Sequence, residues 1–409
     1  MKDRIYIGKH STVTGTVLAL PSSKSLSNRA LLINALMNEQ ASLENLSAAR
    51  DTQLMQKLLH TTEEVINVKD AGTAMRFLTA YFAATGQSKI ITGTERMQER
   101  PIGHLVDALQ TIGARISYTG KQGFPPLRIQ GFDRQLADRV SIKGDISSQF
   151  ISALMMVAPA LQDGLTISLL GKVSSRPYLV MTAELMTLFG IPTLVGSDSI
   201  KISTGTYNPV SYRVEEDWSA ASYWFAFAAL VPGSDILLPN VRTQSLQGDR
   251  VIVELMEKLG VSSHFSQAGL RVKGSGTSNK FLTTDFSDCP DLAQTVLPVC
   301  AGLGVEGKFK GMKSLRIKET DRIAALKSEL AKIGATLSEE NGTWHLLPGR
   351  PKDISEELTI NTYHDHRMAM GFAPLAVLTN VTIENPSVVE KSYPAFWEDM
   401  KSLGFKIGD

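Results

Sequence analysis

The sequence predicts an α/β protein built from six loosely repeated units. Three observations lead to this prediction. A polar cluster followed by an apolar run rich in small residues occurs six times, at intervals of about 70 to 75 residues after a shorter first gap. Amphipathic segments that end in a glycine follow most of these runs. Short stretches of alternating polar and apolar residues fill much of the remainder.

The apolar runs are the first predicted helix of each unit. Because they are apolar nearly all round, we expect burial on every side, and their small residues would allow close approach of neighbouring helices. The clusters that open them contain Ser, Asp and Thr, which commonly cap helix N-termini. The runs cover residues 30–36, 77–84, 150–161, 220–230, 292–303 and 368–378.

The amphipathic segments are the second predicted helix of each unit. Apolar residues recur at helical spacing, as at Ile323, Leu326, Leu330 and Ile333. The terminal glycine suits a left-handed C-cap, and a β-like stretch such as residues 114–118 follows. These segments cover residues 104–113, 178–190, 249–260, 320–334 and 394–404. Periodicity alone leaves the number of strands per unit open.

Length and composition limit the possible classes of protein. A chain of 409 residues predicts two or three domains. The net charge is +1, from 42 Lys plus Arg against 41 Asp plus Glu, so no overall field would recruit nucleic acid or an anionic membrane. Cys289 and Cys300 are too few for a disulfide scaffold, and we expect them to pack in a core. The longest mostly apolar stretch, 220–232, is shorter than the ~20 residues of a membrane span, so we expect a cytoplasmic protein.

Basic residues lie in or just after several of the polar clusters. Examples are Lys24, Arg29, Arg76 and Arg367. A cation at a helix N-terminus opposes the helix dipole, and capping alone does not explain why it is there. An anionic ligand would offset that cost, and several converging helix N-termini would make an anion site. Further basic residues lie in segments 96–103, 174–178, 316–322 and 391–394.

Other classes of site find little support. Residues 21–25 resemble a phosphate loop only superficially, because G-x-x-x-x-G-K-[ST] is absent, and no G-x-G-x-x-G follows a strand. We therefore expect neither an ATP nor an NAD site. Residues 364–366 could suggest a metal, but no Cys or further His lies nearby in sequence, so a capped helix start is favoured. A Ser-His-Asp triad stays open, although no G-x-S-x-G is present.

Seven segments together resemble the 5-enolpyruvylshikimate-3-phosphate synthase family, across essentially the whole chain. KETDR and DHRMAM are the most specific parts. The related UDP-N-acetylglucosamine enolpyruvyl transferases typically carry a cysteine in the loop that matches residues 96–103, and this chain has none there. The seven segments are PSSKSLSNRALLINAL, DAGTAMRFL, ERMQERPIGHLVDAL, GDISSQFISALMM, SSRPYL, SLRIKETDRIAAL and YHDHRMAM.

The resemblance implies two similar domains. Each would contain three βαβαββ units, with buried helices inside and sheets outside, an inside-out α/β barrel. Residues 16–213 would form the shikimate 3-phosphate-side domain. Residues 1–15 and 214–409 would form the second domain, which holds both termini. The family's active site lies in the interdomain cleft.

The resemblance also implies a reaction. Family members transfer the enolpyruvyl group of phosphoenolpyruvate to the 5-hydroxyl of shikimate 3-phosphate and release phosphate, on the shikimate pathway to chorismate and the aromatic amino acids. No cofactor or metal is implied, glyphosate is an expected inhibitor, and we expect a monomer. Two alternatives stay open: a transferase for another acceptor such as UDP-N-acetylglucosamine, and a non-catalytic anion-binding protein of the same fold.

Site residues follow from the same resemblance, position by position. The implied catalytic residues are Lys24, Asp291, Lys318 and Glu319. Lys24 also matches a residue that binds both substrates, and Glu319 and Lys318 are the candidates for proton transfer. Two positions depart from the family pattern, because Asp70 and Ser314 stand where Asn is frequent. The implied substrate-binding residues are Ser25, Arg29, Gly72, Arg100, Ser147, Ser148, Gln149, Ser175, Tyr178, Arg322, His366, Arg367 and Lys391.

Overall fold

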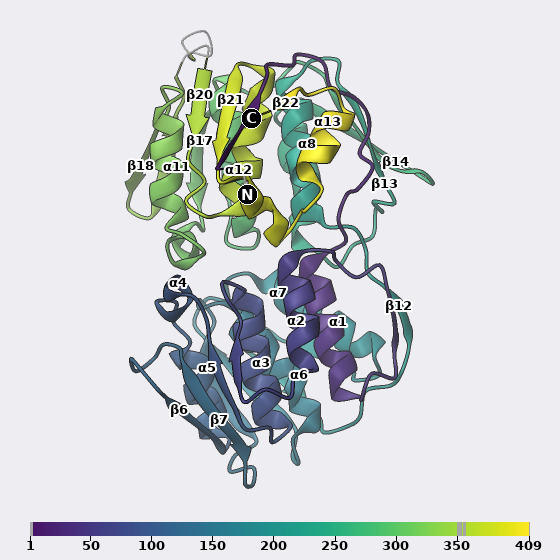
Figure 1. Cartoon of the computed structure of the whole chain (residues 1–409), viewed down its shortest axis with the longest axis vertical. Helices are drawn as coiled ribbons and strands as arrows, with labels where there is room; N and C mark the ends of the chain where they lie inside the picture. Colours follow the sequence, from purple (N-terminus) through teal and green to yellow (C-terminus); the bar gives the residue numbers. More distant parts are fainter. Residues whose placement is uncertain (1–2, 350–353, 355–356, 409) are drawn as a thin grey trace. The chain divides into compact units, whose positions relative to one another are not determined.

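A computed structural model describes residues 3–349, 354 and 357–408 of the chain. It divides into two compact units, and the chain passes from one to the other and back (Figure 1). Unit 1 comprises Met1–Ser22, Ala48–Arg50 and Glu215–Asp409, so it contains both chain termini. Unit 2 comprises Ser23–Ser47 and Asp51–Val214.

The centre of unit 2 is a group of packed helices. Helices α1, α3, α6 and α7 contact one another, and the predicted apolar runs form α1, α3 and α6. Their small side chains, such as Ala74, Ala80 and Ala153, are fully buried and permit this close packing. The helices of this part of the chain are α1 (Lys24–Leu36), α2 (Arg50–Leu59), α3 (Gly72–Ala84), α4 (Glu95–Gln98), α5 (Gly103–Thr111), α6 (Ser148–Val157) and α7 (Arg176–Leu188).

Sheets accompany these helices in unit 2. One has the order β4-β5-β7-β6, formed by Val65–Asn67, Lys89–Thr92, Leu127–Phe132 and Ala114–Tyr118. Another has the order β8-β9-β11-β10, formed by Arg139–Lys143, Leu165–Leu170, Ser199–Ile202 and Leu194–Val195. In each, the first pair is parallel and the later pairs are antiparallel. Strands β3 (Ser42–Glu44) and β12 (Ser211–Arg213) form a parallel pair.

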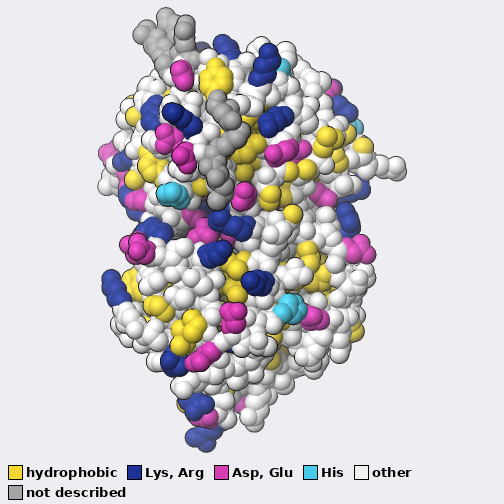
Figure 2. All heavy atoms as spheres, in the orientation of Figure 1, with side chains coloured by type: hydrophobic (Ala, Val, Ile, Leu, Met, Phe, Trp, Pro, Cys, Tyr) yellow, Lys and Arg dark blue, Asp and Glu magenta, His cyan; other side chains and the backbone are white. Residues whose placement is uncertain are grey.

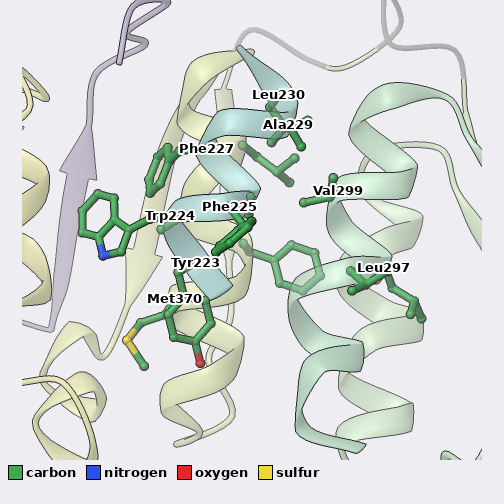
Figure 3. Close-up of a cluster of buried hydrophobic side chains, with 14 of the residues drawn as sticks. Tyr223, Trp224, Phe225, Phe227, Ala229, Leu230, Leu297, Val299 and Met370 are labelled. Atoms are coloured by element: carbon green, nitrogen blue, oxygen red, sulfur yellow. The ribbon is translucent and has the colours of Figure 1, made fainter. Parts of the chain in front are cut away.

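The helices of unit 1 surround a core rich in aromatic residues. Helix α8 buries side chains around its whole circumference. Figure 3 shows Trp224 and Phe227 on the side of α8 away from Leu297 and Val299 of α10, and Tyr223 beside Met370 of α12. Such a helix is stable only when other elements cover every side. The helices are α8 (Trp218–Leu230), α9 (Ile252–Glu257), α10 (Ala293–Leu303), α11 (Arg322–Ala331), α12 (His366–Phe372) and α13 (Phe396–Ser402).

The sheets of unit 1 repeat the strand order seen in unit 2. Each begins with a parallel pair and continues with two antiparallel pairs. The first is β2-β13-β15-β14, formed by Thr14–Thr16, Asp235–Pro239, Gly269–Gly274 and Val261–Ser266. The second is β16-β17-β19-β18, formed by Phe281–Asp285, Glu306–Lys310, Thr343–Leu347 and Thr336–Glu340. The third is β20-β21-β1-β22, formed by Glu357–Ile360, Asn380–Glu384, Arg4–Ile7 and Ile407–Gly408.

The predicted fold class is confirmed. Apart from the short α4, the elements from β4 to β7 follow the βαβαββ order. Strands such as β17 alternate between exposed and buried residues. The predicted amphipathic helices form α5, α7, α9, α11 and α13, and their terminal glycines, such as Gly190 with φ +87°, adopt the left-handed conformation. Two helices, α2 and the short α4, were not predicted, because neither lies in an apolar run or an amphipathic segment that ends in a glycine.

The distribution of charged side chains on the surface agrees with the nearly equal numbers of basic and acidic residues in the sequence. On the face shown in Figure 2, Lys and Arg side chains are interspersed with Asp and Glu. Among the residues that the structure describes, no helix combines the length and the apolar character needed to cross a membrane.

Candidate functional site

Four helices of unit 2 begin at the same level, and Arg29 reveals this alignment. Its side chain lies in the second turn of α1 and is buried. It donates to Thr182 Oγ1 of α7 at 2.7 Å and to Ser152 Oγ of α6 at 3.1 Å. Its guanidinium carbon lies 5.4 Å from the ring centroid of Phe77 in α3. Each partner lies between one and two turns into its helix, so the four N-termini share one end of the unit.

The predicted binding residues of unit 2 lie at these helix starts. Lys24 is the first residue of α1, Gly72 of α3 and Ser148 of α6. Two of the starts are joined directly, because Gln149 Nε2 donates to Thr73 Oγ1 at 3.0 Å. Ser147 caps α6, and Ser175 precedes α7 in the left-handed conformation at φ +56°. Backbone N–H groups at such ends suit an anion.

Lys24 is the member of this group that the structure pairs with an acid. Its Nζ lies 3.4 Å from Oδ2 of Asp51 in α2, and the two side chains are 16% and 5% exposed. The carboxylate holds the ammonium near the start of α1. Sequence reasoning missed Asp51, because α2 itself was not predicted and an ion pair across 27 positions leaves no local pattern.

Arg29 has a different environment from Lys24. Its guanidinium donates hydrogen bonds to the hydroxyls of Thr182 and Ser152 and, at 2.9 Å, to the carbonyl oxygen of Ser25. Burial lowers the pKa of Arg29 to about 10, and the nearby Tyr178 partly offsets this effect. The guanidinium therefore stays charged at neutral pH while it holds the helices together. Its direct contact with a substrate stays a prediction.

Gly72 lies against the guanidinium of Arg100. A Cβ atom at position 72 would lie 2.8 Å from both Nη1 and Nη2 of Arg100, closer than such atoms can approach. Arg100 is 7% exposed, and its Nε has no hydrogen-bond partner among the described residues. Arg76 supports the same corner, since it donates to the Gly72 carbonyl oxygen at 3.1 Å and to that of Pro101 at 3.2 Å. The absence of a side chain at position 72 thus fits the position of Arg100.

In unit 1 the central feature is Arg322, whose side chain is 2% exposed and which contacts three carboxylates. Its Nε lies 2.6 Å from Asp365 Oδ2, its Nη1 2.7 Å from Asp291 Oδ1 and its Nη2 2.9 Å from Glu319 Oε2. These carboxylates raise the pKa of Arg322 against the opposing effect of burial. Asp365 also caps α12, because its Oδ1 accepts from the backbone N–H of Arg367 at 2.9 Å.

Asp291 connects the remaining cations of this cluster. Its Oδ2 lies 3.1 Å from Nη2 of Arg367, and its Oδ1 lies 3.7 Å from Nζ of Lys318. Burial would raise the pKa of Asp291, but Arg367, Lys318 and Arg322 together hold it well below its usual range. The structure therefore brings five predicted residues together in one cluster, which we call the charged cluster: Asp291, Lys318, Glu319, Arg322 and Arg367.

Two residues that sequence reasoning missed extend this cluster. Ser219 Oγ donates to Asp249 Oδ2 and accepts from Arg367 Nη2, which lies 3.3 Å away. Burial raises the pKa of Asp249 to about 6, although Arg367 acts to lower it. The only local signal was the polar stretch 247–249 before a predicted helix, which capping would explain equally well.

The two other predicted residues of unit 1 are buried. His366 begins α12, and its Nδ1 lies 3.6 Å from Oδ1 of Asp365. Lys391 ends the 3₁₀ segment Pro386–Lys391 and is 1% exposed. Substrate contacts by these two side chains stay predictions.

Comparison with known proteins places this arrangement in a family. The sequence profile described as EPSP synthase (3-phosphoshikimate 1-carboxyvinyltransferase) matches residues 7–63 and 60–400. The chain is 46% identical to a 3-phosphoshikimate 1-carboxyvinyltransferase of Bacteroides fragilis, over 99% of this chain and 100% of that protein. It is 36% identical to the enzyme of the same name from Idiomarina loihiensis, over 98% and 99%. A solved structure of EPSP synthase from Acinetobacter baumannii covers 100% of both chains with a TM-score of 0.78 at 19% identity, which shows a shared fold.

Proposed function

This chain belongs to the EPSP synthase family, and we infer that it transfers the enolpyruvyl group of phosphoenolpyruvate to the 5-hydroxyl of shikimate 3-phosphate, releasing phosphate. It is a transferase of the shikimate pathway. The observation that carries this inference is the match over the full length to 3-phosphoshikimate 1-carboxyvinyltransferases. We propose further that it works in the cytoplasm as a monomer.

We propose that the shared end of α1, α3, α6 and α7 binds the anionic groups of the substrates. In this proposal Lys24 and Ser25 contact both substrates, and Gly72 and Arg100 belong to the phosphoenolpyruvate side. The backbone N–H groups and the positive ends of four helix dipoles point to where a phosphate would be stabilised. The shikimate 3-phosphate side comprises Ser147, Ser148, Gln149, Ser175 and Tyr178.

The charged cluster supplies the acid and base chemistry in this proposal. The 5-hydroxyl loses its proton and its oxygen forms a bond to C2 of phosphoenolpyruvate, while C3 gains a proton. The tetrahedral intermediate then loses a proton from C3, and the bond from C2 to the phosphate oxygen breaks. Glu319 and Lys318 are the groups that we assign to these proton transfers.

Asp291 has a different role, because the surrounding cations keep its pKa low. An ionised carboxylate accepts hydrogen bonds and does not donate a proton, so Asp291 is suited to bind substrate hydroxyls. Arg322 orients three carboxylates at once, and Arg367 and Lys391 are assigned to phosphoenolpyruvate. The cations stabilise the negative charge that develops on the departing phosphate.

The test is phosphate release by the purified chain with phosphoenolpyruvate and shikimate 3-phosphate, followed by identification of the enol ether product. UDP-N-acetylglucosamine serves as the second acceptor. With phosphoenolpyruvate as the donor, we expect turnover when shikimate 3-phosphate is the acceptor and none when UDP-N-acetylglucosamine is the acceptor. Turnover with the nucleotide sugar only would identify a different enolpyruvyl transferase, and binding of both substrates without product would indicate a non-catalytic relative.

A further inference from the structure

Asp249 lies beside the charged cluster but outside the proposed set of substrate-binding residues. It belongs to the 3₁₀ turn Gly248–Val251, just before α9, and is 3% exposed. Its Oδ2 accepts a hydrogen bond from Ser219 Oγ. Its Oδ1 is buried and has no hydrogen-bond partner among the described residues. Burying a carboxylate costs folding free energy unless hydrogen bonds or nearby cations offset the loss of solvation.

The hydrogen bond to Asp249 determines what Ser219 can offer to Arg367. A serine hydroxyl has one proton to donate and can also accept. Because that proton goes to the Asp249 carboxylate, the Ser219 oxygen presents lone pairs towards Nη2 of Arg367, 3.3 Å away. The same nitrogen lies 3.1 Å from Asp291 Oδ2. The guanidinium is thus held from two elements, the start of α8 and the turn before α10.

The loop that carries Asp249 is itself fixed to the start of α8. Gln247 Oε1 accepts from the backbone N–H of Trp218 at 3.0 Å, and its Nε2 donates to Glu215 Oε1 at 3.1 Å. Glu215 Oε1 also accepts from the backbone N–H of Leu246 at 3.1 Å. Ser219 follows Trp218 directly, so one set of hydrogen bonds sets the positions of both Ser219 and Asp249. The pair is therefore preorganised before any substrate binds.

We propose that Asp249 is a positioning residue that acts through Ser219 to orient the guanidinium of Arg367 for phosphoenolpyruvate. This inference rests on the proposed function, in which Arg367 binds that substrate. Asp249 itself touches no substrate in this proposal. Without the Asp249 carboxylate the Ser219 hydroxyl could rotate, and its lone pairs would no longer be fixed towards the guanidinium of Arg367.

The proposal is tested by steady-state kinetics of the full chain with Asp249→Ala, Asp249→Asn and Ser219→Ala. Residues that orient a binding group typically contribute about 10- to 100-fold. We expect Asp249→Ala to raise KM for phosphoenolpyruvate about 10-fold or more and to leave KM for shikimate 3-phosphate within about twofold. Asparagine keeps an oxygen that can accept from Ser219, so Asp249→Asn is expected to show a smaller increase.

A double-mutant cycle separates a positioning role from a structural one. If Asp249 acts through Ser219, adding Asp249→Ala to Ser219→Ala changes KM for phosphoenolpyruvate little further. Equal increases in both KM values, additive effects, or an unchanged KM in a folded Asp249→Ala protein would each overturn the proposal. If the alanine variant does not fold, Ser219→Ala tests the same link, because it removes the hydroxyl through which Asp249 acts on Arg367. An unmodified protein that lacks turnover would instead overturn the proposed function.

Discussion

The two units both place cations at helix starts, but they support those cations in different ways. In unit 2, Arg29 and Arg76 donate to hydroxyls, carbonyl oxygens and a thioether, while Lys24 is ion-paired with Asp51. In unit 1, Arg322 alone contacts three carboxylates. Neutral partners leave the positive charge of unit 2 available to an anion. Carboxylate partners balance the charge in unit 1 and bring proton-accepting groups close to the cations.

This difference suggests a division of labour. The helix starts of unit 2 offer backbone N–H groups and the positive ends of helix dipoles to a phosphate. Proton transfer needs an acid and a base close to the reacting atoms, and the proposal gives that role to Glu319 and Lys318 of the charged cluster.

The largest expected effect is the loss of turnover in Lys24→Met. Methionine keeps most of the side-chain length and removes the charge that an anionic substrate needs at the start of α1. We expect kcat/KM to fall by at least about 1000-fold. The free energy of unfolding should also fall, by about 3 kcal/mol, because the buried Asp51 carboxylate loses its cation. Asp51→Asn is the matched control, since it keeps the lysine. Near-normal kcat/KM in Lys24→Met would remove Lys24 from the site.

The second prediction compares the two buried arginines directly. Arg322→Met leaves three carboxylates without their shared cation. We therefore expect the free energy of unfolding to fall by about 3–5 kcal/mol. Arg29→Met leaves hydroxyls and a carbonyl, whose loss of partners costs about 1–3 kcal/mol. Urea unfolding of both variants at pH 7 measures the difference. Equal destabilisation would show that the kind of partner does not distinguish the two units.

The third prediction concerns how the free energy of unfolding depends on pH through Asp249, beside the charged cluster, and Asp291, within it. Asp249 has a pKa raised from 3.8 to about 6, so between these values the folded state holds more protons than the unfolded state. Its contribution to stability therefore falls as the pH rises from about 4 to 6, by about 2–3 kcal/mol. Relative to the unmodified protein, Asp249→Asn should gain stability over this range.

For Asp291 we expect stability to change with pH in the direction opposite to that for Asp249. Its pKa is held low, so its contribution is present above the unfolded value of 3.8 and is lost as the pH falls below it. Relative to the unmodified protein, Asp291→Asn should lose stability as the pH rises through about 4. Urea unfolding from about pH 2 to about pH 7 measures both variants, because the Asp291 effect lies below about pH 4 and the Asp249 effect between about pH 4 and 6. Parallel pH profiles for the two would contradict the opposite shifts.

The sequence predicted the helices of both units because their signals are local. Polar caps, apolar runs and terminal glycines lie within a few residues of one another, as they do around α11, which begins at Arg322 and is followed by Gly334. The number of units followed from periodicity, whereas their strand order and the assignment of individual residues to substrates came from the family resemblance.

The residues that were missed are held by contacts between distant positions. Asp51 pairs with Lys24 across 27 positions, and Asp249 binds Ser219 across 30. Each carboxylate looks like an ordinary helix-start residue in the sequence, because Asp is favoured there by the dipole alone. Only the packing of α2 against the start of α1, or of the 248–251 turn against α8, gives such a residue a second role.

The smallest expected effect tests the tight contact in unit 2. In Gly72→Ala the new methyl group would lie 2.8 Å from two nitrogens of Arg100, so the guanidinium must shift by several tenths of an ångström. We expect the inhibition constant of glyphosate to rise about 10-fold or more and KM for phosphoenolpyruvate to rise less, because a shifted cation still attracts the smaller anion. The steady-state constants with each compound measure this. The helix should be unaffected, since alanine is a better helix former than glycine.

Gly86→Ala is the control for this substitution. A Cβ atom at position 86 would have no neighbour within 4 Å, so only the strained φ of +69° would affect that variant. Unchanged constants in Gly72→Ala, with a folded protein, would place both Gly72 and the neighbouring guanidinium outside the phosphoenolpyruvate site, and unit 2 would then lose one of the cations on which its difference from unit 1 depends.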